Sequence, residues 1–129
     1  MFCNGGKKMS WENILKRPLP INARSDRDNQ YREKIIAYEE TRIEPTFENI
    51  IQNLPAGESR SLTIFTPFNQ PEDKVKNRTY EIGTNAVNAL GQDRRFILNV
   101  IKEIYTKEGY TVEGPTQYES GYGLEIHQP

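Results

Sequence analysis

The sequence predicts an α+β domain in which helices pack on a small antiparallel sheet. The length of 129 residues is that of one domain. An amphipathic helix is predicted over Asp93–Lys107, and Gly109 ends it. A β-hairpin is predicted directly after this helix, with Tyr110–Glu113 paired to Gly121–Ile126. A further strand is expected over Ser59–Thr66, where polar and apolar residues alternate.

The composition predicts a small core. Leu, Ile, Val and Phe make up 29 of the 129 residues, about 22%, just above the roughly 20% below which disorder is expected. The 17 basic residues nearly cancel the 18 acidic ones, which argues against a protein-wide electrostatic grip on nucleic acid or an anionic membrane. No run approaches the roughly 18 apolar residues that span a bilayer. We therefore expect no membrane partner.

The start of the chain is expected to lie outside the folded unit. Residues 1–9 are predicted to be a flexible leader, and residues 10–127 a single domain. Either Met1 or Met9 can be the true start. The start lacks the apolar stretch of a signal peptide, and the single cysteine, Cys3, excludes an intramolecular disulfide. Together these features favour a cytoplasmic protein, in a host cell or virion if it is viral.

The first predicted helix is long and contains a proline. An apolar stripe extends over about residues 27–53, and Ser25 is a candidate N-cap. Pro45 removes a backbone donor and clashes one turn back. The helix therefore either kinks at Pro45 or breaks near Glu44 and restarts with Pro45 in its first turn. We predict two segments that stay roughly in line.

The middle of the chain alternates strands and turns. Leu62 and Ile64 are expected to share one face of the first strand. The polar segment Pro67–Arg78 shows no periodicity and is predicted to be a loop. A short strand over Thr79–Ile82 and a short helix that ends at Gly91 are expected next.

The sequence contains no pattern typical of a catalytic or metal site. A serine or cysteine nucleophile needs a neighbouring base, and the only histidine, His127, is expected in a solvated tail beyond the last strand. One histidine and one cysteine cannot form a usual zinc site. Glu40, Glu44 and Glu48 recur every fourth residue and are expected to form a solvated acidic face or to dock a basic partner. We therefore predict no enzyme, cofactor or metal, with a carboxylate-based hydrolase as a minor alternative.

The polar face of the C-terminal helix is a candidate DNA-contact surface. The order of elements over roughly residues 27–127 also resembles the winged-helix family, in which a recognition helix precedes a two-stranded wing. This resemblance in topology implies that Asp93–Lys107 is the recognition helix and Gly114–Gly121 the wing. The side chains expected to contact DNA are Arg94, Arg95, Asn99, Lys102 and Lys107.

Four tyrosines crowd the predicted helix and hairpin. Tyrosine is favoured at protein interfaces, and on a small sheet it is also a good strand residue that covers a thin core. The function predicted from sequence is a non-enzymatic protein–protein interaction or assembly component, with another protein or a second copy of the chain as partner. In length, polarity and Asn and Tyr content the chain is similar to small accessory or structural proteins of viruses and phages. The alternative is a winged-helix-like DNA-binding regulator. The predicted interaction surface consists of Tyr105, Tyr110, Tyr118 and Tyr122.

Overall fold

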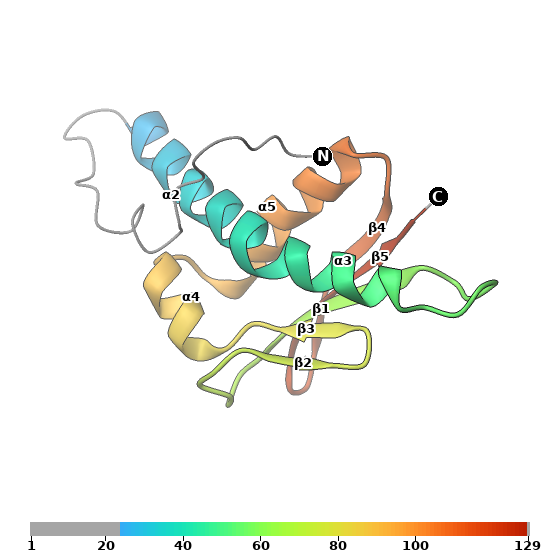
Figure 1. Ribbon diagram of the computed structural model, residues 1–129. Coiled ribbons are helices and arrows are strands. Elements are labelled where there is room, and N and C mark those ends of the chain that lie inside the picture. Colours follow the sequence, from blue (N-terminus) through green and yellow to red (C-terminus); the bar gives the residue numbers. More distant parts are fainter. Residues whose placement is uncertain (1–23, 129) are drawn as a thin grey trace.

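Helices cover one face of a five-stranded sheet (Figure 1). The computed structural model describes residues 24–128, so the prediction of a leader over residues 1–9 lies outside the described residues. The α+β class predicted from sequence is confirmed. The described elements are α2 (Arg24–Tyr38), the π-helix η1 (Glu39–Ile43), α3 (Glu44–Gln52), β1 (Ser61–Pro67), β2 (Lys74–Lys76), β3 (Thr79–Glu81), α4 (Thr84–Leu90), α5 (Arg94–Lys107), β4 (Thr111–Tyr118) and β5 (Gly121–His127).

The sheet is mixed, which corrects the prediction of a purely antiparallel one. Its strand order is β2-β3-β1-β5-β4, and β1 pairs with β3 in parallel while the other three pairings are antiparallel. The parallel pair arises because β2 lies inside the segment Pro67–Arg78 that was predicted to be a loop. β2 turns back on β3 through Asn77, whose φ of 56° suits a tight hairpin turn. The sequence of β2 is Lys-Val-Lys. Its single apolar residue is not enough to form the alternating pattern that indicates a strand.

The long helix continues through Pro45 without a break. The π-helix η1 precedes α3, and the Glu44 N–H donates to the Glu39 carbonyl, one residue further back than in an α-helix. Pro45 then lies in the first turn of α3, where its missing N–H costs little. The predicted break near Glu44 does not occur, whereas the expectation that the residues before and after Pro45 stay roughly in line agrees with Figure 1, in which α2, η1 and α3 follow one another without interruption.

The C-terminal helix and hairpin form as predicted, and the hairpin strands extend further than predicted. The Asp93 side chain caps α5 by accepting a hydrogen bond from the Phe96 N–H at 2.8 Å. The hairpin strands are longer than predicted, and only Glu119 and Ser120 separate β4 from β5. Most of the predicted wing, Gly114–Gly121, therefore lies within strands. Because β5 is an interior strand between β1 and β4, the hairpin belongs to the main sheet, and the winged-helix resemblance is not confirmed.

Alternation along the central strands separates a covered face from an open face. On β1, Leu62, Ile64 and Thr66 are buried under the helices, as the sequence predicted for the first two. On β5, Leu124 and Ile126 are buried on the same side. α5 packs on this side against β4, β5 and α2. The core on the covered face consists of Ile35, Tyr38, Ile43, Phe47, Leu62, Ile64, Tyr80, Ile82, Ala86, Val87, Leu90, Ile97, Leu98, Val100, Ile101, Tyr105, Leu124 and Ile126.

Candidate functional site

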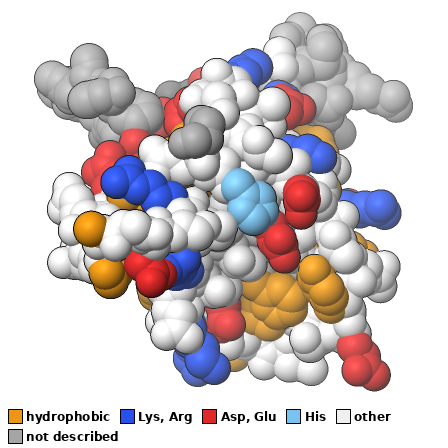
Figure 2. Space-filling view, turned by 90° about the vertical axis from the view of Figure 1, so that its right-hand side faces the viewer, with side chains coloured by type: hydrophobic (Ala, Val, Ile, Leu, Met, Phe, Trp, Pro, Cys, Tyr) orange, Lys and Arg blue, Asp and Glu red, His pale blue; other side chains and the backbone are white. Residues whose placement is uncertain are grey.

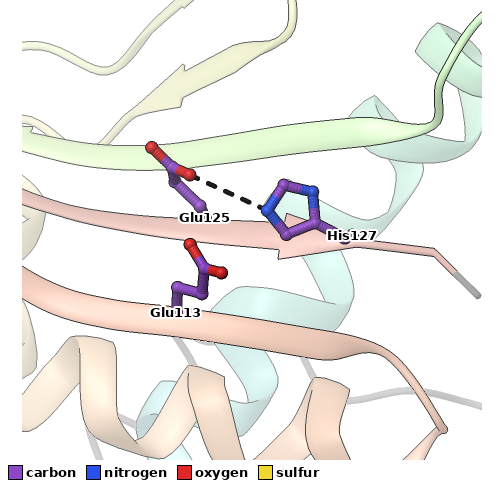
Figure 3. Close-up of side chains that lie close together, drawn as sticks. All are labelled: Glu113, Glu125 and His127. Atoms are coloured by element: carbon purple, nitrogen blue, oxygen red, sulfur yellow. Dashed lines mark ion pairs between the residues drawn. The ribbon is translucent and has the colours of Figure 1, made fainter.

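The open face of the sheet carries a cluster of two carboxylates and an imidazole. Glu113 on β4 lies directly opposite Glu125 on β5, and Glu125 lies opposite Thr63 on β1. His127 is two residues beyond Glu125 and therefore points to the same side. One ligand atom from each of Glu113, Glu125 and His127 lies within 4.8 Å of the others (Figure 3). We call these three residues the carboxylate–imidazole cluster.

His127 is held in the sheet, which corrects the prediction of a solvated tail residue. It is the last residue of β5 and pairs in register with Ser61 on β1. Its Nδ1 lies 2.9 Å from the Ser61 Oγ, and the Ser61 Oγ in turn lies 3.0 Å from the Ser59 Oγ. Its Nε2 faces the Glu125 Oε1 at 3.7 Å. The ring is therefore oriented by its neighbour on β1, a pairing that is distant in sequence.

The order Ser61, His127, Glu125 resembles a nucleophile–base–acid series, but its geometry does not favour that chemistry. The distance of 3.7 Å between His127 and Glu125 exceeds that of a hydrogen bond. Both side chains are also well exposed, at 39% for His127 and 50% for Glu125. Such a series needs an imidazole that is hydrogen-bonded to its acid, together with donors placed where negative charge develops. The cluster is better suited to binding positive charge.

A shallow aromatic cleft adjoins the cluster on the same face. The rings of Phe65 on β1 and Tyr118 on β4 lie 6.2 Å apart on either side of Gly123. A Cβ at Gly123 would lie 2.9 Å from the Tyr118 Cε2, so only glycine leaves room for this ring. Figure 2 shows the single histidine beside acidic side chains, with an apolar patch below them. The cleft measures about 320 Å³ and is lined by Thr63, Phe65, Tyr118, Ser120, Gly123, Leu124 and Glu125.

The four tyrosines of the predicted interaction surface do not form one surface. Tyr105 is only 4% exposed and packs in the core. Tyr110 is half-buried beside it, with the two rings 5.3 Å apart. Tyr118 is exposed on the open face, whereas Tyr122 packs on Phe68 on the other side of the sheet. Of the four, Tyr118 alone contributes to the aromatic cleft.

A buried acid on the covered face is a second titratable feature. Glu39 lies in the π-helix, is 3% exposed, and accepts a hydrogen bond from the Tyr105 hydroxyl. Burial raises the pKa of Glu39 to about 7, although the hydrogen bond from Tyr105 opposes this shift. Burial also raises the pKa of the Tyr105 hydroxyl. Near neutral pH, Glu39 is therefore divided between its charged and neutral forms.

A second carboxylate near the helices is fully engaged. Asp73 accepts hydrogen bonds from the Tyr38 hydroxyl at 2.5 Å, the Tyr80 hydroxyl at 2.8 Å and the Gly83 N–H at 2.7 Å. These contacts fix the segment between β1 and β2 against α2 and β3. Asp73 has no remaining need for an external partner, and we assign it a structural role.

The predicted DNA-contact residues on α5 divide into engaged and exposed side chains. Arg94 donates to the Thr84 Oγ1 at 3.1 Å and stacks on Phe68, and Lys102 donates to the Gly114 carbonyl at 2.7 Å. Glu103 interrupts the basic row and pairs with Arg32 on α2. The side chains that remain exposed are Arg95, Asn99 and Lys107.

The predicted acidic face of the long helix does not gather into a cation site. Glu48 is exposed, and Glu40 and Glu44 are partly buried. Within residues 24–128, the carboxylate–imidazole cluster is the one group of three whose side chains could hold a metal ion. The prediction that the chain lacks metal-binding residues could not foresee this group, because its members come together only through the register of β4 and β5.

No protein-family model, curated protein or solved structure matches the chain. Among the described residues, no helix has both the length and the apolar character needed to cross a bilayer.

Proposed function

We propose that the protein is an assembly component that associates with a second copy of itself through the open face of its sheet. The observation that carries the proposal is the distribution of side chains on this face. The aromatic cleft lies near its centre, the carboxylates of Glu113 and Glu125 lie toward β4, and Lys74 and Lys76 lie on β2 at the opposite edge.

The two lysines project to the open side because of their register. Lys74 pairs with Glu81 and Lys76 with Thr79, and these residues alternate with Tyr80, which is buried on the covered side. A twofold axis through the centre of the face would therefore place the β2 lysines of one copy over the β4 and β5 carboxylates of the other. Such an isologous contact is self-complementary in charge and closes as a dimer.

Face-to-face packing is favoured over pairing at the sheet edges. The β2 edge holds three residues, which is short for strand addition. The β4 edge is interrupted by a register shift between Glu113 and Thr116, and the Gly114 carbonyl already accepts from Lys102. The open face instead offers Phe65 and Tyr118, the kind of aromatic pair that anchors protein interfaces.

The size of the face predicts a weak dimer. The five strands contain 28 residues, each of which covers about 3.3 Å along the strand and about 4.8 Å across it, which gives a planar area of roughly 440 Å². This is below the roughly 800 Å² per partner of a typical stable interface. We therefore expect a dissociation constant of the order of micromolar or weaker, with a loss of affinity in high salt.

Sedimentation equilibrium with paired charge reversals tests the proposal. The K74E/K76E and E113K/E125K variants should each remain monomeric at concentrations where the wild-type chain dimerises. An equimolar mixture of the two should recover a heterodimer, because the reversed charges again complement one another. Lys107→Glu on the exposed end of α5 is the control and should dimerise like the wild type. A wild-type chain that stays monomeric at about 500 µM in low salt would overturn the proposal.

DNA binding by α5 is the second candidate, favoured by the exposure of Arg95, Asn99 and Lys107. Labelled duplex DNA in fluorescence anisotropy should then bind in about 50 mM salt and lose at least tenfold in affinity at about 200 mM. Arg95→Ala should weaken this binding. The proposal keeps the viral or phage origin and the cytoplasmic or virion location inferred from sequence.

A further inference from the structure

The charges of the carboxylate–imidazole cluster are poorly balanced within the described chain. Glu113 and Glu125 face one another directly across β4 and β5, an arrangement of like charges that destabilises a sheet. In the described part of the chain, the ion pair of Glu125 is with His127, and no basic side chain pairs with Glu113. The arrangement therefore favours an additional positive charge between the two strands.

The orientation of His127 indicates what kind of charge fits. Metal-bound histidines are usually held by a hydrogen bond from the ring nitrogen that does not bind the metal. Here the Nδ1 contacts the Ser61 Oγ at 2.9 Å, and the Nε2 is directed toward the Glu125 carboxylate. The imidazole thus presents one nitrogen to the carboxylates while the other is fixed by β1. Figure 3 shows the ring beside both carboxylates.

We infer that Glu113, Glu125 and His127 form a binding site for a divalent transition-metal ion, for which Zn²⁺ is a suitable probe. One imidazole nitrogen with two carboxylates is a donor set that suits zinc and similar first-row ions. Ser61 acts as a positioning residue for the imidazole. Because the face is exposed, water completes the coordination sphere.

The distances permit such a site after small side-chain movements. Metal–ligand distances near 2.1 Å place tetrahedral ligand atoms about 3.4 Å apart. The ligand atoms of the cluster lie within 4.8 Å of one another, so the most distant pair must approach by at most about 1.4 Å. Both glutamates are exposed. Their long side chains can therefore make this adjustment by changing rotamer, without moving the backbone.

Isothermal titration with ZnCl₂ at about 10 µM protein tests the site. The titration uses the wild-type chain and the Cys3→Ser variant, which lacks the only thiol. We expect the wild-type chain and the Cys3→Ser variant each to bind one Zn²⁺ with micromolar affinity. Glu113→Gln, Glu125→Gln and His127→Gln should each weaken binding at least tenfold, and Ser61→Ala should weaken it less. Glu119→Gln, in the turn of the same hairpin, is the matched control and should bind within twofold of the wild type.

Nuclear magnetic resonance provides an independent readout at the histidine. The ring protons of His127 should shift with Zn²⁺ up to one equivalent, and the shift should disappear in the Glu113→Gln variant. The thermal transition of each variant shows whether the chain is still folded. Absence of binding at about 100 µM Zn²⁺ would overturn the inference. Equal binding by the wild type and the three cluster variants would also overturn it, because the ion would then lie elsewhere.

The metal site does not rest on the proposed dimer, because its ligands all come from one chain. The two proposals nevertheless place positive charge beside the same carboxylates. Saturating Zn²⁺ should therefore weaken self-association, which sedimentation can measure separately. Loss of metal binding with an intact dimer would remove only the metal site, and a monomer that binds Zn²⁺ would remove only the dimer.

Discussion

Carboxylates on the covered and open sides of the sheet have different surroundings. On the covered side, Glu39 accepts from the Tyr105 hydroxyl and Asp73 accepts from two tyrosines and a backbone N–H. On the open side, Glu113 and Glu125 oppose one another, with His127 as their nearest counterpart. The fold thus supplies partners for acids among the helices. It leaves Glu113 and Glu125 available to a partner from outside.

The difference follows from the cost of burial. A carboxylate without donors costs several kcal/mol inside a protein, whereas water solvates an exposed one. Opposed carboxylates can therefore persist on an open face, where their repulsion is screened. This is why an unbalanced pair on the surface is informative about ligands, while a well-paired buried acid is informative about stability.

The largest expected effect is a difference in unfolding free energy between variants of two adjacent residues of β5. Leu124 is fully buried on the covered side, and Glu125 is exposed on the open side. Leu124→Ala should lower the free energy of unfolding by about 3 kcal/mol, because it leaves a cavity in the core. Glu125→Ala should change it by less than about 1 kcal/mol. Urea denaturation at low protein concentration measures both.

Similar losses for both variants would contradict this division of the sheet into two faces. Thr63→Ala, on the neighbouring strand and the same side as Glu125, is a further control. Its free energy of unfolding should also lie within about 1 kcal/mol of that of the wild type.

The next largest effect is a pH dependence that originates on the covered side. Burial raises the pKa of Glu39 from 4.5 to about 7. The folded state therefore binds this proton more tightly than the unfolded state, and stability falls as the pH rises from about 4.5 to about 7. At 1.36 kcal/mol per pKa unit, the loss amounts to about 3 kcal/mol.

Glu39→Gln isolates this contribution, because an amide does not titrate. Other groups affect both chains alike, so the measured quantity is the difference in unfolding free energy between the variant and the wild type. The unfolding free energy of the variant minus that of the wild type should be about 2–3 kcal/mol larger at pH 7.5 than at pH 4.5. The exposed Glu119→Gln variant should show no such change. A constant difference for Glu39→Gln would show that folding does not raise the pKa of Glu39.

Local patterns in the sequence predicted α5 and β1. α5 follows from its apolar periodicity and the Asp93 cap, and β1 from the alternation around Leu62 and Ile64. The same periodicity already placed Tyr105 in the apolar stripe of α5. Its burial could therefore be predicted from the sequence, and it agrees with the alternative in which tyrosines cover a thin core.

The candidate site was not predictable because it depends on pairing between distant strands. Ser61 and His127 are 66 residues apart and meet only through the register of β1 with β5. Glu113 opposes Glu125 on one side of a register shift that follows Glu113. A change of one residue in either register would turn these side chains to the other face. Sequence alone does not specify such a register.

The smallest expected effect is a gain of stability on the open face. Glu113→Gln removes the repulsion with Glu125 and should raise the free energy of unfolding by roughly 0.2–1 kcal/mol in metal-free, low-salt buffer. Glu125→Gln should give a similar gain, and the double variant little more, because the first substitution already removes the interaction. The Glu119→Gln variant should show no gain. Fully additive gains would mean that the two carboxylates do not interact. A non-additive gain, abolished by salt, would show that the sheet keeps a repulsive pair of carboxylates, as expected of residues that serve binding rather than folding.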